Sequence, residues 1–218
     1  MKLWVDPVAR SGPEAMAVDE WLVERRLGVV LRVYRWEGDW GSVGYFGKLR
    51  EAQADFPGLQ WVRRWTGGGT VDHRGDWTYS VIVPPGEAAF SWKGAESYRV
   101  IHEALAQALG VVGVFARMSS GAEETGASAC FENPVCHDLI DARGAKLAGA
   151  GQRRTRSGLL HQGSVAVELK SPESSLVLAE ALAGRLAERW GCIGLELQKE
   201  EIAPFLQRYA KNQWLEKR

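Results

Sequence analysis

The feature that most limits the fold of this chain is the segment from Val135 to Leu169, VCHDLIDARGAKLAGAGQRRTRSGLLHQGSVAVEL. It contains three strand-like runs separated by the turn sequences Ala-Arg-Gly and Arg-Ser-Gly. Turns this short join neighbouring antiparallel strands. The segment therefore predicts a β-meander, and any fold of the chain has to include a sheet.

Helical and strand-like patterns alternate through the rest of the sequence. Helical periodicity is present in four segments, which are 14–27 after Ser11-Gly12-Pro13, 98–109, 174–190 and 200–212. Strand-like runs are 30–36, 60–65, 77–83 and 111–118, and the turn-rich residues 72–76 predict a hairpin in front of the third run. A Gly-rich stretch, 38–47, separates the first two runs. These patterns predict mixed helix and sheet.

The composition excludes several classes of protein. The chain has 218 residues, 45% of them hydrophobic, which is enough for one well-buried domain that we place at 1–218. Lys and Arg number 27, as do Asp and Glu, so the net charge gives no reason to expect a nucleic acid or an anionic membrane as partner. No apolar run approaches the roughly 18 residues of a membrane span, and the start does not resemble a signal peptide. A cytoplasmic protein is expected.

The three cysteines predict neither a disulfide framework nor a metal site. Cys130, Cys136 and Cys192 are an odd number, and none is spaced as a CxxC pair. Cys130 follows a small, polar loop sequence, so substrate could reach it, and an accessible thiol near a cation can be a nucleophile. A free thiol used as a small core residue is the alternative. Cys136 is interpreted as a structural residue within a strand.

A glycine-rich loop is the first candidate binding site. Three consecutive glycines, Gly67, Gly68 and Gly69, follow a predicted strand and stand beside Arg63 and Arg64. Glycine allows the backbone to approach a ligand closely, and its amides with a guanidinium group could hold phosphate or carboxylate oxygen. A simple bend between strands is the alternative, and the sequence is not a Walker A or dinucleotide-binding motif.

Lys146 is the second candidate. It stands among small residues in AKLAGAG, where Gly149 and its neighbours leave room for a bulky group against the sheet. A lysine beside an acyl carbonyl would stabilise the oxyanion of acyl transfer. The alternative is a lysine at a strand end that points to solvent. Among the histidines, His102 lies in a helical pattern and is expected to be structural, whereas His73 and His161 are near Gly-containing segments and could touch a ligand.

At these residues the sequence resembles the lipoate-protein ligase A family, and within it the octanoyltransferases that use a loop cysteine. The resemblance extends through most of the chain in a fixed order of blocks. They are MAVDEWL, LRVYRW, SVGYFG, VRRWTGGGTVDH, WTYSVIV, ACFENPVCHDL, GAKLAGAGQRR, LLHQGSV and RYAKNQW. Each block alone is ordinary, but their combination in this order is specific.

The resemblance implies a fold and a set of site residues. The fold is α+β, with a mixed, largely antiparallel sheet flanked by helices, as in the catalytic domains of biotin and lipoate ligases and of class II aminoacyl-tRNA synthetases. Arg64 and the three glycines match the family's acyl or acyl-adenylate loop, and His73 matches the histidine that follows it. Lys146 matches the lysine that holds the acyl carbonyl. Cys130 matches the cysteine of the CF-x-x-P block, which is the acyl-accepting nucleophile of the transferases.

The resemblance also implies a reaction and its partners. The Cys130 thiolate would attack an octanoyl thioester on acyl carrier protein, with the oxyanion stabilised by Lys146 and loop amides. A lysine of the glycine-cleavage H protein or of a dehydrogenase E2 lipoyl domain would then take the octanoyl or lipoyl group, without a cofactor. Trp65, Trp77 and Tyr79 are candidates for the sheath of the acyl chain.

Two departures from the family pattern bear on these expectations. The family often has Gln-His-Gly-Ser where this chain has His161-Gln162-Gly163-Ser164, which makes any role of His161 open. A separate C-terminal accessory domain, which many ATP-dependent ligases carry, is not expected here, and this favours a transferase.

Two rivals remain. The first is an ATP-dependent lipoate ligase in which Arg64, the glycine loop and Lys146 hold an acyl-adenylate with Mg²⁺. The second is a non-catalytic homologue that binds lipoyl domains or free acyl acids.

Overall fold

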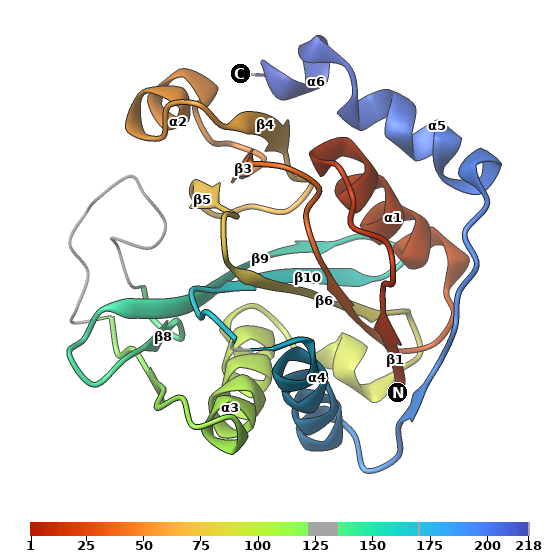
Figure 1. Cartoon of the computed structure of the whole chain (residues 1–218). Helices are drawn as coiled ribbons and strands as arrows, with labels where there is room; N and C mark the ends of the chain where they lie inside the picture. The colour runs from red at the N-terminus through yellow and green to blue at the C-terminus, as the bar shows by residue number, and fades with distance from the viewer. Residues whose placement is uncertain (122–134, 170, 218) are drawn as a thin grey trace.

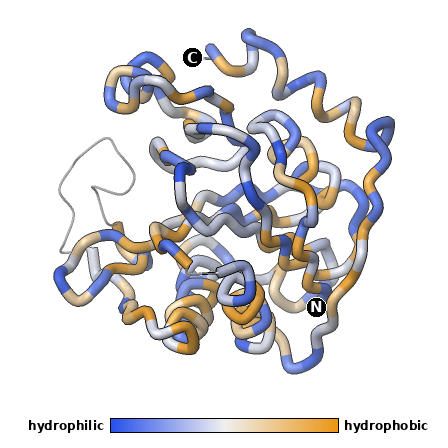
Figure 2. Tube along the Cα trace, viewed as in Figure 1, coloured by the Kyte–Doolittle hydropathy of each residue, from blue (hydrophilic) through white to orange (hydrophobic). Residues whose placement is uncertain are grey.

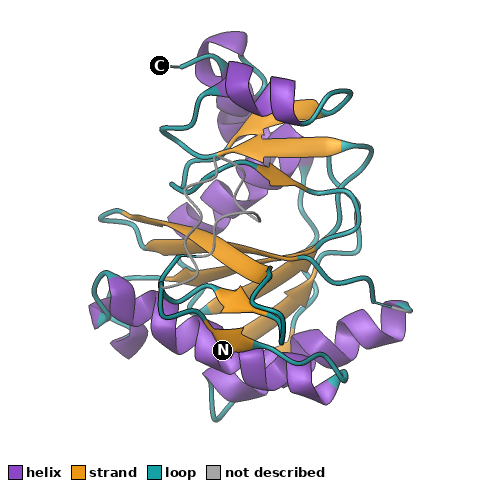
Figure 3. Cartoon of the chain, turned by 90° about the vertical axis from the view of Figure 1, so that its left-hand side faces the viewer, coloured by secondary structure: helices purple, strands orange, loops and turns teal. Residues whose placement is uncertain are grey.

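The computed structural model describes residues 1–121, 135–169 and 171–217 and arranges them in layers. A large sheet occupies the middle of the molecule, and a smaller sheet lies above it in the views of Figure 1 and Figure 3. Helices lie beneath the large sheet, between the two sheets and over the small one.

Eight strands form the large sheet within the described residues, in the order β11-β1-β2-β6-β10-β9-β8-β7. The first three run parallel, and from β2 to β7 each strand is antiparallel to the next. Their bounds are β1 Lys2–Val5, β2 Val30–Tyr34, β6 Trp77–Val83, β7 Arg117–Met118, β8 Leu139–Ile140, β9 Lys146–Arg154, β10 Leu159–Val165 and β11 Gly191–Cys192. The predicted meander is therefore confirmed as β8, β9 and β10.

The small sheet was only partly predicted. It contains β4 Gln60–Arg63, β3 Trp40–Val43 and β5 Val71–Asp72, with β3 in the centre. The predicted hairpin at 72–76 is wrong because β5 pairs with β3, while β6 belongs to the large sheet. The Gly-rich stretch holds strand β3, and helix α2, Leu49–Asp55, follows it; the sequence pattern indicated neither. Residues 71–77 thus link the two sheets.

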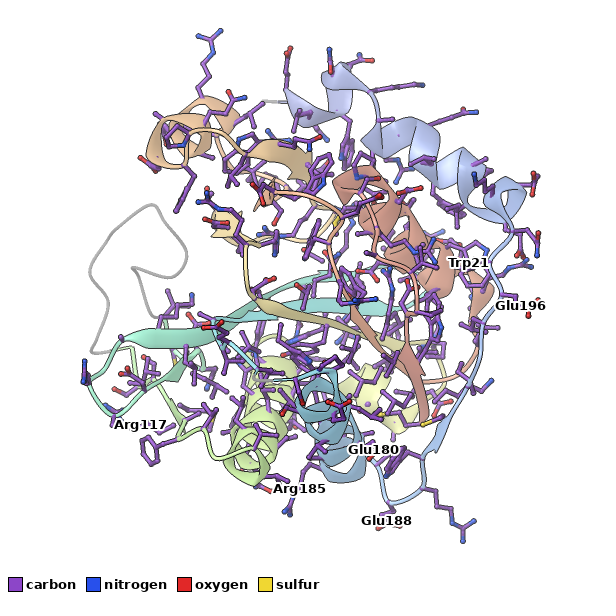
Figure 4. All side chains as sticks on the ribbon, in the orientation of Figure 1. Trp21, Arg117, Glu180, Arg185, Glu188 and Glu196 are labelled. Atoms are coloured by element: carbon purple, nitrogen blue, oxygen red, sulfur yellow. The ribbon has the colours of Figure 1, made fainter. Side chains whose placement is uncertain are left out.

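The helices cover both faces of the large sheet. Helices α3, Ala95–Val111, and α4, Pro172–Leu186, pack on one face over the core that includes Leu105, Leu109 and Leu182. Figure 2 shows strongly hydrophobic residues in these two helices. Arg185 and Glu188 lie at the outer, lower edge of the molecule in Figure 4. The apolar side of each helix therefore packs against the sheet.

Helix α1, Gly12–Arg25, packs on the opposite face of the sheet. The Ser11 amide donates to the Glu14 carboxylate at 3.1 Å, as in a capping box, and Pro13 occupies the first turn. The helix ends at Arg25, before Arg26 with its φ of 51°, rather than at residue 27. Met16 and Asp19 are on its side that packs on the sheet, where both are buried.

Several predicted elements differ in their bounds, among them two helical segments and one strand. The helix predicted at 174–190 ends at Leu186, and Gly191 begins strand β11 instead. The helical pattern at 200–212 divides into α5, Lys199–Tyr209, and α6, Asn212–Leu215. The predicted strand at 111–118 is shortened to Arg117–Met118. Helix α3 continues to Val111, and a turn at 112–113 follows it. A short 3-10 helix, η1 Ala88–Ser91, follows β6.

Candidate functional site

A pocket lies between α1, the small sheet and the centre of the large sheet, and its space of about 430 Å³ is partly open to solvent. The residues that line it come from all three layers: Met16, Tyr34, Trp36, Arg64, Gly68, Val71, His73, Thr78, Gly149, Ala150, Gly151, Gln162, Gly163 and Ser164. Gly68 is exposed, whereas Met16 and Gln162 are buried, so the pocket has an open end at the Gly-rich loop and a closed end under α1. Several predicted site residues are thus brought together from distant parts of the sequence.

The Gly-rich loop is packed tightly against backbone on two sides. A Cβ on Gly44 would come within 2.0 Å of the Gly68 carbonyl oxygen, and one on Gly151 within 2.4 Å of the Gly67 carbonyl oxygen. Gly68 itself has a φ of 92°, in the left-handed region that favours glycine. The loop therefore needs glycine at 68 for its own turn, and also glycine in the two segments that contact it.

Arg64 holds this loop in place. Its Nη2 donates to the carbonyl oxygens of Gly67 at 3.2 Å and Gly69 at 2.8 Å, and its Nη1 donates to the backbone and side chain of Ser42. Arg64 is buried. The guanidinium group thus joins β3 to the loop, in addition to lining the pocket.

His73 belongs to a buried hydrogen-bonded row at the pocket wall. Its Nε2 lies 2.6 Å from the Ser42 Oγ and its Nδ1 lies 2.7 Å from the Asp76 carboxylate. The indole of Trp36 stacks on the imidazole with ring centroids 4.0 Å apart. The histidine is therefore fixed on three sides, and it lines the pocket.

Lys146 is a buried cation beside the pocket and not the solvent-exposed strand end that was the alternative. Its Nζ lies 2.6 Å from the Asp138 carboxylate, and both side chains are almost inaccessible. A Cβ on Gly149 would come within 2.7 Å of the Lys146 Cε and 2.9 Å of its Nζ. The lysine side chain therefore runs directly alongside Gly149, which lines the pocket.

His161 lies on the other face of the sheet. Its Nε2 is 3.2 Å from the Tyr79 hydroxyl and its Nδ1 is 2.8 Å from Gln152, and it is fully buried under α3 together with Tyr79 and His102. Burial lowers the pKa of His161 well below its ordinary value, and the nearby His102 adds to this effect. The structure therefore does not bring His161 into the pocket with the other candidates.

Gln162 occupies the position next to His161 and faces the pocket instead. Its Nε2 donates to the Asp19 carboxylate at 2.8 Å, and its Oε1 accepts from Thr66 at 2.7 Å. Asp19 in turn accepts from the fully buried Arg32 at 2.6 Å. Sequence reasoning missed Gln162, although the alternation of a predicted strand already requires residues 161 and 162 to face opposite ways.

The expected aromatic sheath is wrong in two positions. Trp77 and Tyr79 belong to the core under α3 and α4, on the face of β6 that is turned away from the pocket. Trp65 is partly buried, and Arg153 lies over its ring, 4.7 Å from the centroid. The aromatic side chains that line the pocket are Tyr34 and Trp36, together with Met16 and Val71 as apolar neighbours.

Two cysteine predictions have different outcomes. Cys130 lies outside the described residues. Cys136 is exposed in a turn, and the prediction that it falls within a strand is wrong. The adjacent His137 has a φ of 73°, which interrupts an extended backbone before β8 begins.

The described part of the chain contains neither a cluster of metal-ligating side chains nor a membrane-spanning helix. No group of three or more His, Cys, Asp or Glu side chains there is arranged to hold a metal ion. Among the same residues, no helix has both the length and the apolar character needed to cross a membrane.

The chain is similar in sequence to proteins that are named octanoyltransferases. The octanoyltransferase LipM of Kyrpidia tusciae is 33% identical over 190 residues, which are 80% of this chain and 68% of that protein. LipM of Brevibacillus brevis is 34% identical over 179 residues, 74% of this chain and 64% of that protein. The chain thus spans about two thirds of the length of these relatives.

The fold and the family are established independently of each other. The chain superposes on the bi-partite lipoate protein ligase of Thermoplasma acidophilum with a TM-score of 0.67 at 18% identity, over 99% of this chain and 95% of that one. This confirms the expected α+β fold, with its large, mostly antiparallel sheet flanked by helices. The model of the lipoyl protein ligase A/B catalytic domain matches residues 11–193. The chain belongs to the lipoyl protein ligase A/B catalytic domain family.

Proposed function

We propose that this chain is an acyltransferase that moves an octanoyl or lipoyl group to a specific lysine of a lipoyl-acceptor domain. The observation that carries the proposal is a pocket lined by the Gly-rich loop and the small-residue strand β9, with the Lys146–Asp138 pair beside Gly149 at its wall. An apolar slot suits an acyl chain, since each buried methylene contributes about 0.8 kcal/mol. The names of the two LipM relatives support octanoyl as the group.

The proposed nucleophile is Cys130, on the strength of the CF-x-x-P block. Residues that the structure describes before and after 122–134, the range that contains Cys130, support the assignment. The Ser119 amide donates to the Asp138 carbonyl at 2.7 Å, and the His137 amide donates to the Ser119 carbonyl at 3.1 Å. Both flanks of the segment are therefore held beside Asp138, the partner of Lys146.

The proposed reaction has two steps. The Cys130 thiolate attacks the thioester carbonyl of octanoyl-acyl carrier protein, the bond from this carbonyl to the carrier sulfur breaks, and the carrier leaves as its thiolate as the enzyme thioester forms. The neutral amine of the acceptor lysine then attacks this thioester, the bond to Cys130 breaks, and the proton that the amine loses balances the charge of the released Cys130 thiolate. The Lys146 ammonium group stabilises the oxyanion in both steps. No ATP or metal ion takes part.

The remaining candidates are assigned to substrate binding. Gly67, Gly68 and Gly69 present backbone at the open end of the pocket, and Arg64 keeps them there. His73 and Gly149 line the wall. His161 is left out of the proposed site because it contacts Tyr79 and Gln152 on the far face of the sheet.

Intact mass of the wild type and of Cys130→Ala tests the proposal. Each protein is incubated with octanoyl-acyl carrier protein without ATP, and an apo lipoyl acceptor is then added. The expected result is a hydroxylamine-labile octanoyl adduct on the wild type alone, which moves to the acceptor. The acceptor is either the glycine-cleavage H protein or an E2 lipoyl domain, and both are tried.

Two outcomes would replace the proposal. Modification of the acceptor by free acid with ATP and Mg²⁺, in both proteins and without an adduct, would identify a lipoate ligase and make Cys130 incidental. Tight binding of acyl acid or acceptor with neither adduct nor transfer would identify a non-catalytic homologue.

A further inference from the structure

The Asp76 carboxylate collects hydrogen bonds from the pocket wall. It lies in the turn before β6, and its side chain is 4% exposed. His73 Nδ1 is 2.7 Å from Oδ2, the Thr78 hydroxyl donates to Oδ1 at 3.0 Å, and the Ser164 hydroxyl donates to Oδ2. His73, Thr78 and Ser164 all line the pocket, and they come from three different segments of the chain. One carboxylate therefore ties the turn, β6 and β10 together at this wall.

One row of hydrogen bonds reaches Asp76 through Thr78. The indole N–H of Trp36 donates to the Thr78 Oγ1 at 2.8 Å. A hydroxyl has a single hydrogen, and that of Thr78 is given to the Asp76 Oδ1. Both hydrogen bonds of this row are therefore donated in the direction of Asp76, and its Oδ1 has to be an acceptor.

A second row reaches Asp76 through His73. The Arg64 Nη1 donates to the Ser42 Oγ at 2.6 Å, so the single hydrogen of Ser42 is available for the His73 Nε2 at 2.6 Å. The imidazole then carries its hydrogen on Nδ1 and gives it to the Asp76 Oδ2. In this tautomer each polar hydrogen of the row meets one acceptor.

The order Ser42, His73, Asp76 matches that of a hydrolytic triad, but the surroundings do not. The Ser42 hydroxyl is fully buried and already accepts a hydrogen bond from Arg64, so no substrate carbonyl can reach it. The row instead fixes the His73 ring, on which Trp36 stacks. Both rows therefore position the same two rings of the pocket wall.

We infer that Asp76 is a positioning residue for acyl-chain binding, an assignment that rests on the proposed function. Its two oxygens hold the stacked Trp36 and His73 rings in one arrangement before the ligand arrives, which lowers the entropy cost of binding. In Asp76→Asn, one oxygen becomes an NH₂ group. Either the Thr78 hydroxyl or the Nδ1–H of His73 then faces the amide NH₂ group, which is a donor, where the wild type has a carboxylate oxygen. The Trp36 and His73 rings are then no longer held in a single arrangement.

The test compares Asp76→Asn with Asp72→Asn. Asp72 lies four residues earlier, and its carboxylate is bonded by the exposed Arg74 rather than by pocket residues. Steady-state kinetics with octanoyl-acyl carrier protein, titration with octanoate and NMR of the His73 tautomer are measured for both variants. For Asp76→Asn, the KM and the Kd of octanoate are expected to rise about tenfold, with kcat reduced by less than about threefold. In the wild type and in Asp72→Asn, His73 is expected to be the Nδ1–H tautomer alone. In Asp76→Asn, a mixture of the two tautomers is expected.

Three results would bear against this inference or against the proposed function. Identical KM, Kd and tautomer in Asp76→Asn and Asp72→Asn would overturn the role of Asp76. If Asp76→Asn does not fold, Thr78→Val breaks only the Trp36 row, and an unchanged Kd in that variant would overturn it too. A wild type that modifies no acceptor would refute the proposed function alone, because the octanoate titration and the tautomer still decide the role of Asp76.

Discussion

Lys146 owes its position to two neighbours, a carboxylate and a residue without a side chain. Asp138 supplies the opposite charge at 2.6 Å, which a buried ammonium group requires. Gly149 supplies the space, since any Cβ there would overlap the lysine side chain. Gly149, one of the small residues that the sequence shows around Lys146, therefore makes room for the lysine side chain.

Replacement of Gly149 by alanine is expected to slow acyl transfer. The new methyl group forces the flexible end of Lys146 to move from its place beside Asp138, a shift that costs little folding free energy but displaces the ammonium group. The rate of transfer to the acceptor and the thermal midpoint measure the two effects. Gly191→Ala is the matched control, because nothing lies within 4 Å of its added Cβ. A Gly149→Ala protein with the wild-type transfer rate would contradict the proposed role of Lys146.

At the level of elements, Arg63 connects strand β4, the C-terminal helix α6 and the loop after β3. Its Nε donates to the carbonyl oxygens of Trp214 and Leu215, and its Nη1 donates to those of Gly44, Tyr45 and Gly47. The residue is 1% exposed. The planar guanidinium group is suited to this arrangement because its donors point in fixed, separate directions.

Arg63→Lys is expected to release α6 and the loop 44–47 together. A single ammonium group cannot reach both sets of carbonyl oxygens, so partly buried carbonyl oxygens lose a hydrogen bond worth about 1 kcal/mol each. Hydrogen exchange should increase in 44–47 and 212–215 and stay unchanged in β9 and β10. Arg25→Lys, at an exposed ion pair with Glu201, is the control. Equal exchange in the two variants would show that the charge alone holds these segments.

At the level of the whole molecule, the two faces of the large sheet carry different polar groups. On the pocket face, Arg32 is fully buried between Asp6 and Asp19, at 2.8 and 2.6 Å. On the far face, His102 and His161 are fully buried with their rings 5.4 Å apart. Burial lowers the pKa of both histidines, so the folded protein keeps them neutral.

The free energy of unfolding is expected to fall as the pH drops below about 6.5, the ordinary pKa of histidine. In this range the unfolded chain binds protons at both positions, whereas the folded chain does not, because each folded-state pKa lies below 6.5. Each histidine can contribute up to about 1.4 kcal/mol per pH unit. Urea unfolding between about pH 5 and about pH 8 measures the slope.

His161→Gln should reduce this slope and leave the unfolding free energy at higher pH less affected, since glutamine can still bond to Gln152. A wild-type unfolding free energy that is constant over this pH range would show that the buried histidines are not held neutral by the fold.

The sequence by itself determined the elements that local periodicity encodes. The meander of β8, β9 and β10, the strand at 77–83 and the helices around 14–25 and 98–109 follow from alternation, helical spacing and turn residues. It also singled out the Gly-rich loop, His73 and Lys146, because glycine runs and isolated polar residues are visible without a structure. The order of the family blocks gave the fold.

Only the tertiary structure decided which face of the sheet became the pocket. Strand alternation separates His161 from Gln162 but does not say which of them meets α1, and Trp77 and Tyr79 could be assigned to the ligand for the same reason. Strand β5 is two residues long and gains its partner β3 from 30 positions away, so no local pattern announces it. Asp76 looked like a turn residue, and its importance arises from donors on β6 and β10 that only long-range packing brings to one carboxylate.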